Sequence, residues 1–350
     1  MVDSCILGRF RVFLKLSFFG FVITSCHTAP LKESPLTEAN ELAQRGLLRE
    51  SLDSYNKALL QDPENPIIHR NLGVIYLKAG NYNASLDHFK KSYPQFKDNF
   101  KTNFYMGEAN RALENYAQAL FYYQKALLAK EDPALSKSLA WTYFQMSCYK
   151  EALEIIENAQ KKSTKDWQLK VIQAKVLLKL KRFNEAEELL TREEKSSGKA
   201  FRPYVLSLKG DLMMARGKSQ KAYSYYKDSL KNKPLLASSL LGLGKYYLNQ
   251  SQPHEAITYL EQAMRIKPSE LEPYLQLAKA YESSDTNKSA SYYKYFFDKA
   301  STNPEYLELL EGIQTKINKF SEKSPSGLQN INQKTDEGSG TFQKSKNNTG

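Results

Sequence analysis

The chain has 350 residues, of which 41% are hydrophobic and 25% charged, a composition typical of a globular protein rather than a disordered one. Three cysteines cannot form a disulfide framework, four scattered histidines leave little for a metal site, and no apolar run reaches the length of an ordinary membrane-spanning helix. The formal net charge of +12 favours acidic partners such as anionic lipids, acidic peptides, nucleic acid or glycans.

Residues 1–25 have the pattern of a secretory signal, in which a basic segment precedes a short apolar run. The basic residues are Arg9, Arg11 and Lys15. The apolar run covers residues 16–23, and small residues then lead to Cys26. This order resembles the lipobox of bacterial lipoproteins, in which the signal is cut before the cysteine and the thiol carries a diacylglyceryl group. The open alternatives are an ordinary signal peptide and a buried apolar N-terminus.

The resemblance to lipoproteins implies a membrane anchor on Cys26. Two or more acyl chains hold a protein stably on a bilayer, whereas a single chain does so only marginally. The next residue is His27 and not Asp, which under Gram-negative sorting rules favours the outer membrane. The sequence therefore predicts a lipid-anchored protein on the periplasmic side of the outer membrane, with residues 26–35 as the tether.

Residues 36–303 repeat one motif about every 34 residues. Two series of small residues advance together, with identical steps of 34, 34, 33, 34, 36, 34 and 34. The first series is Ala39, Gly73, Gly107, Ala140, Ala174, Gly210, Gly244 and Ala278, and the second is Ser51, Ser85, Ala119, Ala152, Ala186, Ala222, Ala256 and Ala290. Small residues let two helix backbones come close, and prolines between units cannot continue a helix. The pattern therefore predicts a series of packed helix pairs.

This 34-residue helix–turn–helix unit is similar to the tetratricopeptide repeat. The clearest unit, 237–270, contains Leu243, Gly244 and Tyr247 in its first helix and Ala256 in its second. The resemblance implies an all-α, right-handed solenoid of eight repeats with a concave groove. The predicted units are 32–65, 66–99, 100–132, 133–166, 167–202, 203–236, 237–270 and 271–303.

The end of the repeat region has its own signals. Residues 304–320 carry an apolar stripe at helical spacing, which predicts a helix that caps the stack. Residues 321–350 have almost no apolar side chains, so we expect a disordered tail. Two extra residues in the fifth unit fall near 196–199, where either a longer loop or a flexible joint is possible.

Catalytic signatures are missing from the sequence. It contains no GxSxG, HExxH, P-loop or CxxC motif, and its histidines lack metal-ligand spacing. Cys148 is interpreted as a structural cysteine. We therefore expect no enzyme activity, no cofactor and no metal.

The remaining candidate site is the groove. In tetratricopeptide proteins, fixed positions of each first helix line the concave face. Transferred to this chain, they give a mixture of aromatic and charged residues: Arg70, Phe104, Glu108, Arg111, Lys137, Trp141, Phe144, Lys175, Tyr204, Asp211, Lys245 and Lys279. Such a surface can hold an extended peptide through aromatic contacts and charge-assisted hydrogen bonds. For Trp141 and Phe144, packing between units is the alternative.

A lipobox followed by tetratricopeptide repeats resembles outer-membrane lipoproteins such as type IV pilus pilotins, which help a secretin ring to assemble. The resemblance implies a non-enzymatic scaffold that binds a protein segment in its groove, without nucleic acid or a small-molecule substrate. One alternative is a regulatory lipoprotein of peptidoglycan synthases or hydrolases. Another is a cytoplasmic adaptor whose N-terminus is not a lipobox.

Overall fold

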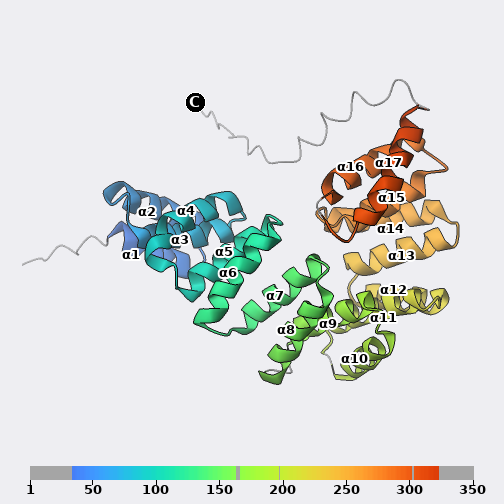
Figure 1. Ribbon diagram of the computed structural model, residues 1–350, viewed down its shortest axis with the longest axis horizontal. Helices are drawn as coiled ribbons and strands as arrows, with labels where there is room; N and C mark the ends of the chain where they lie inside the picture. The colour runs from blue at the N-terminus through green and yellow to red at the C-terminus, as the bar shows by residue number, and fades with distance from the viewer. Residues whose placement is uncertain (1–33, 163–165, 197, 302, 323–350) are drawn as a thin grey trace, which may run out of the picture. The chain divides into compact units, whose positions relative to one another are not determined.

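The structure is a computed structural model that describes residues 34–162, 166–196, 198–301 and 303–322. The predicted signal, Cys26 and nearly all of the predicted tail lie outside these ranges. The helices of the described residues (Figure 1) are α1 (Pro35–Gln44), α2 (Leu48–Gln61), α3 (Pro66–Lys78), α4 (Tyr82–Phe96), α5 (Phe100–Ala112), α6 (Tyr116–Ala129), α7 (Pro133–Gln145), α8 (Tyr149–Lys162), α9 (Trp167–Lys179), α10 (Phe183–Ser196), α11 (Arg202–Ala215), α12 (Ser219–Asn232), α13 (Ala237–Asn249), α14 (Pro253–Ile266), α15 (Glu272–Tyr281), α16 (Thr286–Ala300) and α17 (Leu307–Glu322).

The chain divides into two compact units after Pro63. The first contains α1 and α2, which pack on each other. At their crossing, Ala39 and Ser51 are fully buried, and the Ser51 hydroxyl donates a hydrogen bond to the Ala39 carbonyl at 3.0 Å. The sequence had raised a joint near 196–199 as one option, but the division into compact units falls elsewhere.

In the second unit, each odd-numbered helix from α3 to α15 packs on the helix that follows it. Successive odd-numbered helices also contact one another along the unit, so they form a layer of their own. We call the exposed side of this layer the inner face, because first helices line the concave side of such solenoids. The all-α arrangement of repeated helix pairs predicted from the sequence is confirmed.

Helix starts follow the local sequence. The side chains of Asn65, Asn81 and Asn99 accept hydrogen bonds from backbone N–H groups in the first turns of α3, α4 and α5. Such caps satisfy N–H groups that have no partner within the helix. Asp132 and Asp166 cap α7 and α9 in the same way. These caps mark the starts of the first helices α3, α5, α7 and α9, and therefore help to decide which of their side chains reach the inner face.

One large side chain from each second helix fills the crossing of every pair. These residues are at most 2% exposed, and they are Tyr55, Phe89, Tyr123, Ile156, Leu190, Tyr226, Leu260 and Tyr293. Glycine is required where a ring presses directly on the first helix. A Cβ atom at Gly73, for example, would lie 2.8 Å from the Phe89 ring. The small residues of the first series therefore make room for the large ones.

The last helix covers the end of the second unit. α17 packs on α16 and buries Ile313 and Phe320. Lys316 of α17 also reaches back to α15, where it pairs with Glu282 at 2.6 Å. α17 begins at Leu307, three residues after the start of the predicted capping helix, because residues 303–306 form a turn.

Candidate functional site

Six predicted groove residues occupy equivalent positions on successive first helices. One is Glu108 on α5, and the other five lie on α7, α9, α11, α13 and α15. Each directly follows a small residue of the first series, and neighbouring helices in this set contact one another. The row that these five form, called here the inner row, consists of Trp141, Lys175, Asp211, Lys245 and Lys279. The repeat therefore places one aromatic residue, three cations and one carboxylate along a single face.

Lys175 lies over the Trp141 ring, with its amine 5.2 Å from the ring centroid. Within the described residues, its amine forms no hydrogen bond or ion pair. Burial lowers the pKa of Lys175, and the more distant carboxylates of Glu270 and Asp211 only partly oppose this effect. Lys175 is thus a desolvated cation that has a ring but no anion beside it.

Asp211 is engaged within its own repeat. It accepts a hydrogen bond from the Tyr226 hydroxyl at 2.8 Å. Burial raises the pKa of Asp211, although this hydrogen bond and the charges of Lys245 and Lys175 act in the opposite direction. Burial and the Asp211 charge also raise the pKa of Tyr226. Asp211 therefore serves first as an acceptor that fixes the Tyr226 ring.

Lys245 has a carboxylate partner. Its amine lies 2.9 Å from Glu272, which also accepts a hydrogen bond from Gln276 at 2.9 Å. Burial by itself would lower the pKa of Lys245, but the charge and hydrogen bond of Glu272 outweigh burial and raise it. Lys279 is exposed, and its charge helps to hold the pKa of Glu272 down against burial.

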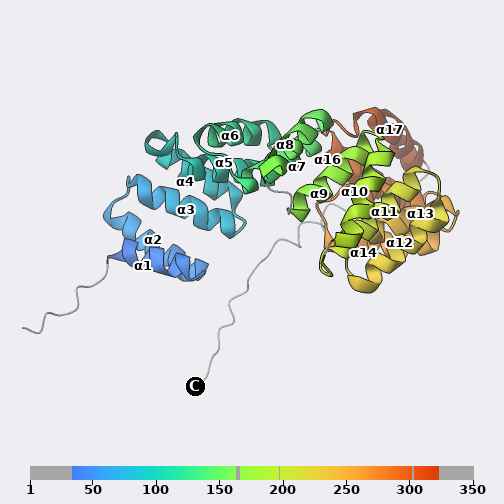
Figure 2. The same ribbon diagram turned by 90° about the horizontal axis from the view of Figure 1, so that it is seen from below.

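The inner face is crossed by a contact between distant parts of the chain. Lys179 of α9 pairs with Glu305, which lies 126 residues later, in the segment between α16 and α17. Figure 2 shows the helices of this unit turned by 90° from the view of Figure 1. Burial and the charges of Glu272 and Glu305 raise the pKa of the neighbouring Tyr306. The C-terminal part of the second unit therefore contributes carboxylates to the surroundings of the inner row.

Glu108 and Arg111 of α5 bind each other rather than standing free. Their ion pair is 2.6 Å long, and Glu108 also accepts a hydrogen bond from the Tyr123 hydroxyl at 2.5 Å. Burial raises the pKa of Glu108, but the Arg111 hydrogen bond and charge outweigh it and leave the pKa lowered. Glu108 thus plays the same part toward Tyr123 as Asp211 plays toward its own tyrosine.

Two further predicted residues in the first half of the second unit also contact near neighbours. The Arg70 guanidinium lies 4.5 Å from the centroid of the Phe96 ring. Phe104 stacks on Phe100, with 5.8 Å between ring centroids. The structure does not bring either of these residues into the inner row.

The other predicted residues flank α9 and α11. Lys137 pairs with Asp166 at 3.2 Å. Tyr204 lies 5.5 Å from the Trp167 ring and accepts a hydrogen bond from the Lys233 amine. These contacts lie near the N-terminal ends of α9 and α11, beside the inner row.

The expectation that Phe144 presents an aromatic surface in the groove is wrong. Phe144 is only 8% exposed and belongs to the hydrophobic core that runs from α7 to α13. It stacks on Trp141 at 5.4 Å and contacts Tyr149 at 5.7 Å. The position of Phe144 on α7 turns its ring toward α8. The ring therefore packs against Trp141 from the core side.

Sequence reasoning missed the tyrosines of the second helices and the acidic residues around α15. Tyr123 and Tyr226 lie fifteen residues after the carboxylates they bind, a spacing visible in the sequence. Glu272 is the first residue of α15, two repeats after Tyr204, and it meets Lys245 only through the stacking of successive repeats. Glu305 belongs to the connection before α17 and carries no local signal.

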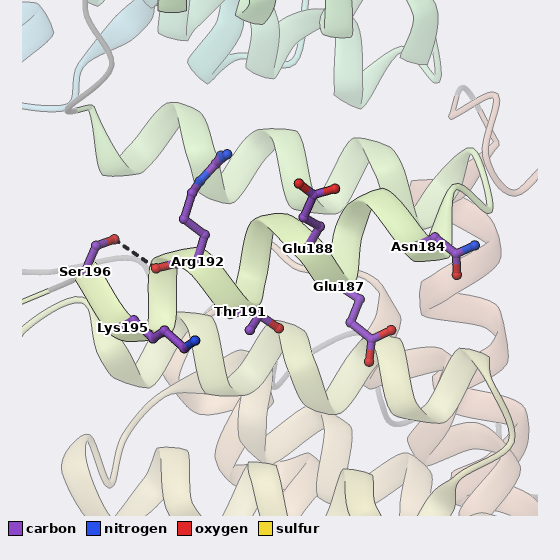
Figure 3. Close-up of a pocket in the computed structure, with 7 residues that line it drawn as sticks. All are labelled: Asn184, Glu187, Glu188, Thr191, Arg192, Lys195 and Ser196. Carbon is purple, nitrogen blue, oxygen red and sulfur yellow. Dashed lines mark hydrogen bonds between the residues drawn. The ribbon is translucent and has the colours of Figure 1, made fainter.

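A hollow of about 780 Å³ lies elsewhere, against α10. All of its lining residues come from that single helix (Figure 3): Asn184, Glu187, Glu188, Thr191, Arg192, Lys195 and Ser196. Glu187 already pairs with Arg216 at 2.6 Å. Residues of a single helix do not enclose a ligand, and none of the predicted site residues lines this hollow.

Neither a metal-binding cluster nor a membrane-spanning helix occurs in the described residues. In the described ranges, no three His, Cys, Asp or Glu side chains gather where they could hold a metal ion. The same part of the chain contains no helix of sufficient length and apolar character to span a bilayer.

Family models match three parts of the chain. A model described as TPR repeat matches residues 39–80, and one described as tetratricopeptide repeat matches residues 237–270. The chain contains tetratricopeptide repeats in these two stretches. Residues 112–193 match the model of anaphase-promoting complex, cyclosome, subunit 3. The matches cover the beginning, middle and end of the repeat region.

Solved tetratricopeptide structures support the same fold. A tetratricopeptide repeat protein from Parabacteroides merdae aligns with a TM-score of 0.64 at 16% identity, over 70% of this chain and 97% of that one. PilW, a type IV pilus biogenesis factor, aligns at 17% identity over 59% of this chain and 96% of its own. The TM-score of this alignment is 0.48.

Among curated proteins, the BBSome complex member BBS4 of Bos taurus is 25% identical over 126 residues. The match covers 36% of this chain and 24% of the bovine protein. The chain therefore matches about a quarter of the length of this relative.

Proposed function

We propose that this protein is a non-enzymatic tetratricopeptide scaffold that holds a segment of a partner protein on its inner face. The observation that carries the proposal is the inner row. Successive repeats bring Trp141, Lys175 and Lys245 to one side of one helix layer. An aromatic side chain next to cations suits an extended peptide, because the ring buries apolar groups and the cations bind carboxylates or carbonyls.

The proposal places the scaffold on a membrane through its N-terminus. Its support is the order of the basic segment, the apolar run 16–23 and Cys26 in the sequence. A lipid on Cys26 and a short tether would keep the repeats at the periplasmic surface of the outer membrane. There the inner face would meet components of an envelope machine.

A role like that of the type IV pilus pilotins is the leading specific form. It rests on the combination of a lipobox with tetratricopeptide repeats in the sequence. The rival form is a regulator of peptidoglycan synthases or hydrolases. Deleting a pilotin removes secretin multimers and twitching motility, whereas deleting a cell-wall regulator alters cell shape or causes lysis while secretin persists.

Affinity capture tests the proposal directly. The tagged full-length protein is purified from detergent-solubilised envelopes, beside a Cys26→Ser version, and the partners are identified by mass spectrometry. We expect Cys26→Ser to move the protein out of the membrane fraction, and a secretin or pilus component to be recovered only with the unaltered protein. Recovery of cell-wall enzymes would select the rival form. Cytoplasmic partners captured equally by both versions would refute the membrane-anchored scaffold.

A further inference from the structure

We infer that Lys175 is the position on the inner face that receives a carboxylate, supplied by an aspartate or glutamate side chain of the bound segment. Trp141 supports an apolar group next to that carboxylate. The inference rests on the proposed scaffold function and names the chemistry of its partner.

Lys175 differs from the other lysines of α7, α9, α11 and α13. α7, α9, α11 and α13 carry six lysines, and five of them pair with a carboxylate inside the protein. The pairs are Lys137 with Asp166, Lys170 with Glu193, Lys179 with Glu305, Lys209 with Glu194 and Lys245 with Glu272. Among the described residues, no carboxylate lies within ion-pair distance of Lys175.

The unpaired Lys175 amine would be stabilised by an anionic partner. A buried charge is costly unless it is paired and hydrogen-bonded, and a ring face compensates only in part. Two carboxylates act electrostatically on Lys175, and both are engaged elsewhere. Glu270 pairs with Lys267 at 3.8 Å, and Asp211 accepts a hydrogen bond from Tyr226 at 2.8 Å. A carboxylate from outside would give Lys175 the charge-assisted hydrogen bond that the other five lysines already have.

The surroundings favour a carboxylate over a phosphate. Asp211 and Glu270 are near enough to act electrostatically on Lys175. They would repel a phosphate group, which carries a charge of about −1.5 to −2 at neutral pH. A single lysine balances the single charge of a carboxylate. The Trp141 ring next to the amine offers apolar contact for the stem of an Asp or Glu residue and for its neighbour.

A bound carboxylate would also change the titration of Lys175. The charged groups that face it are Asp211 on α11, Lys179 on α9, and Lys267 and Glu270 between α14 and α15. In the free protein, burial holds the pKa of Lys175 below its ordinary value. A carboxylate beside the amine raises that pKa, because it stabilises the charged form.

The probe for the test is acetylated, amidated hexaglutamate, with hexaglutamine as its neutral match and inorganic phosphate as a second anion. Calorimetry on the full-length chain compares the unaltered protein with Lys175→Met, Lys175→Arg and Lys221→Met. The Lys221→Met control removes the same charge from an exposed position of the second helix α12, outside the inner row. NMR of ¹³C-methylated lysines follows the pKa of Lys175.

We expect hexaglutamate to bind and to raise the pKa of Lys175, and Lys175→Met to weaken binding at least tenfold. Lys175→Arg and Lys221→Met should stay within about threefold of the unaltered protein. Lys175→Met should unfold at the same temperature or higher, because it removes an unpaired buried charge. No binding of hexaglutamate, equal binding by Lys175→Met, or tighter binding of phosphate would overturn the inference.

Failure of this inference can be separated from failure of the scaffold proposal. If Lys175→Met still captures the same envelope partner as the unaltered protein, the scaffold proposal stands and the carboxylate position is wrong. If the unaltered protein captures no envelope partner, the scaffold proposal itself fails.

Discussion

The Tyr226 ring offers a sharp test of the packing account. It is 1% exposed and lies against two glycines, Gly210 of its own repeat and Gly242 of the next. A Cβ atom at position 242 would lie 2.8 Å from Cδ1 of the ring, and two other ring atoms would be closer still. Such distances are below van der Waals contact, so Gly242→Ala must displace the ring or separate the two helices.

The magnitude follows from two opposing effects. Alanine in the middle of a helix is more favourable than glycine by about 1 kcal/mol. Overpacking a buried site costs about 1–3 kcal/mol, and this site should lie near the upper end, because the rigid ring is also tied to Asp211 by a 2.8 Å hydrogen bond. We therefore expect Gly242→Ala to lower the free energy of unfolding by about 1–2 kcal/mol.

Gly312→Ala is the matched control. Gly312 is in the exposed part of α17, and nothing lies within 4 Å of a Cβ atom placed there. The same helix-propensity gain should therefore stabilise this variant by about 0.5–1 kcal/mol. The difference between the two variants isolates the cost of the clash, about 2–3 kcal/mol.

Guanidinium denaturation followed by circular dichroism at 222 nm measures both variants against the unaltered chain. The expected order of midpoints is Gly312→Ala, then the unaltered chain, then Gly242→Ala. If Gly242→Ala were as stable as Gly312→Ala, the ring would be free to move, and the reason given for glycine beside a buried ring would be wrong.

Two further predictions concern single contacts. Tyr226→Phe removes the hydroxyl that binds Asp211, and the same denaturation assay should show a loss of about 1 kcal/mol, with no loss contradicting a structural role for that hydrogen bond. His88 has its Nδ1 2.9 Å from Nδ1 of His69, and burial together with the His69 and Lys91 charges lowers the pKa of His88 from 6.5 to about 4. Because the unfolded chain binds the proton more readily, stability should fall as the pH drops from 6.5 toward 4, by about 1–2 kcal/mol after allowance for the partial exposure of the ring. His88→Gln should remove that part of the pH dependence, and an unchanged difference across the window would count against it.

The repeat architecture could be predicted because it depends on local spacing. Each pair of helices needs a small residue at its crossing, and Gly73, Gly107 and Ala140 mark three successive crossings in the sequence. Polar caps such as Asn65 and Asp132 then set the helix starts. Packing between neighbours repeats with the sequence, so the periodicity contains most of the information about the fold.

The candidate site was predicted less completely, because side-chain partners depend on contacts between repeats. The sequence placed Lys175, Asp211 and Lys245 in one row, but it did not show that Lys245 has a carboxylate partner and Lys175 has none. Glu272 reaches Lys245 from the following helix pair, at 2.9 Å. The contact of Lys179 with Glu305 joins residues that are 126 positions apart, and no local sequence pattern predicts it.

Phe144 shows a second limit of the positional argument. The rule that assigns groove positions treats every first helix alike. In α7, however, Trp141 already occupies the inner face, and Phe144 turns into the core beside Tyr149. Two aromatic residues three positions apart cannot be assigned to core or surface without knowing what packs against them.

Site-specific photo-crosslinking in living cells tests the central claim most directly. p-Benzoyl-phenylalanine replaces Trp141 in the inner row or, as the control, Phe121 of α6, which is 47% exposed and belongs to a second helix. The account predicts a crosslinked envelope partner from position 141 and none from position 121. A partner crosslinked from position 121 and not from 141 would show that binding occurs on the outer helices, and would contradict the proposal.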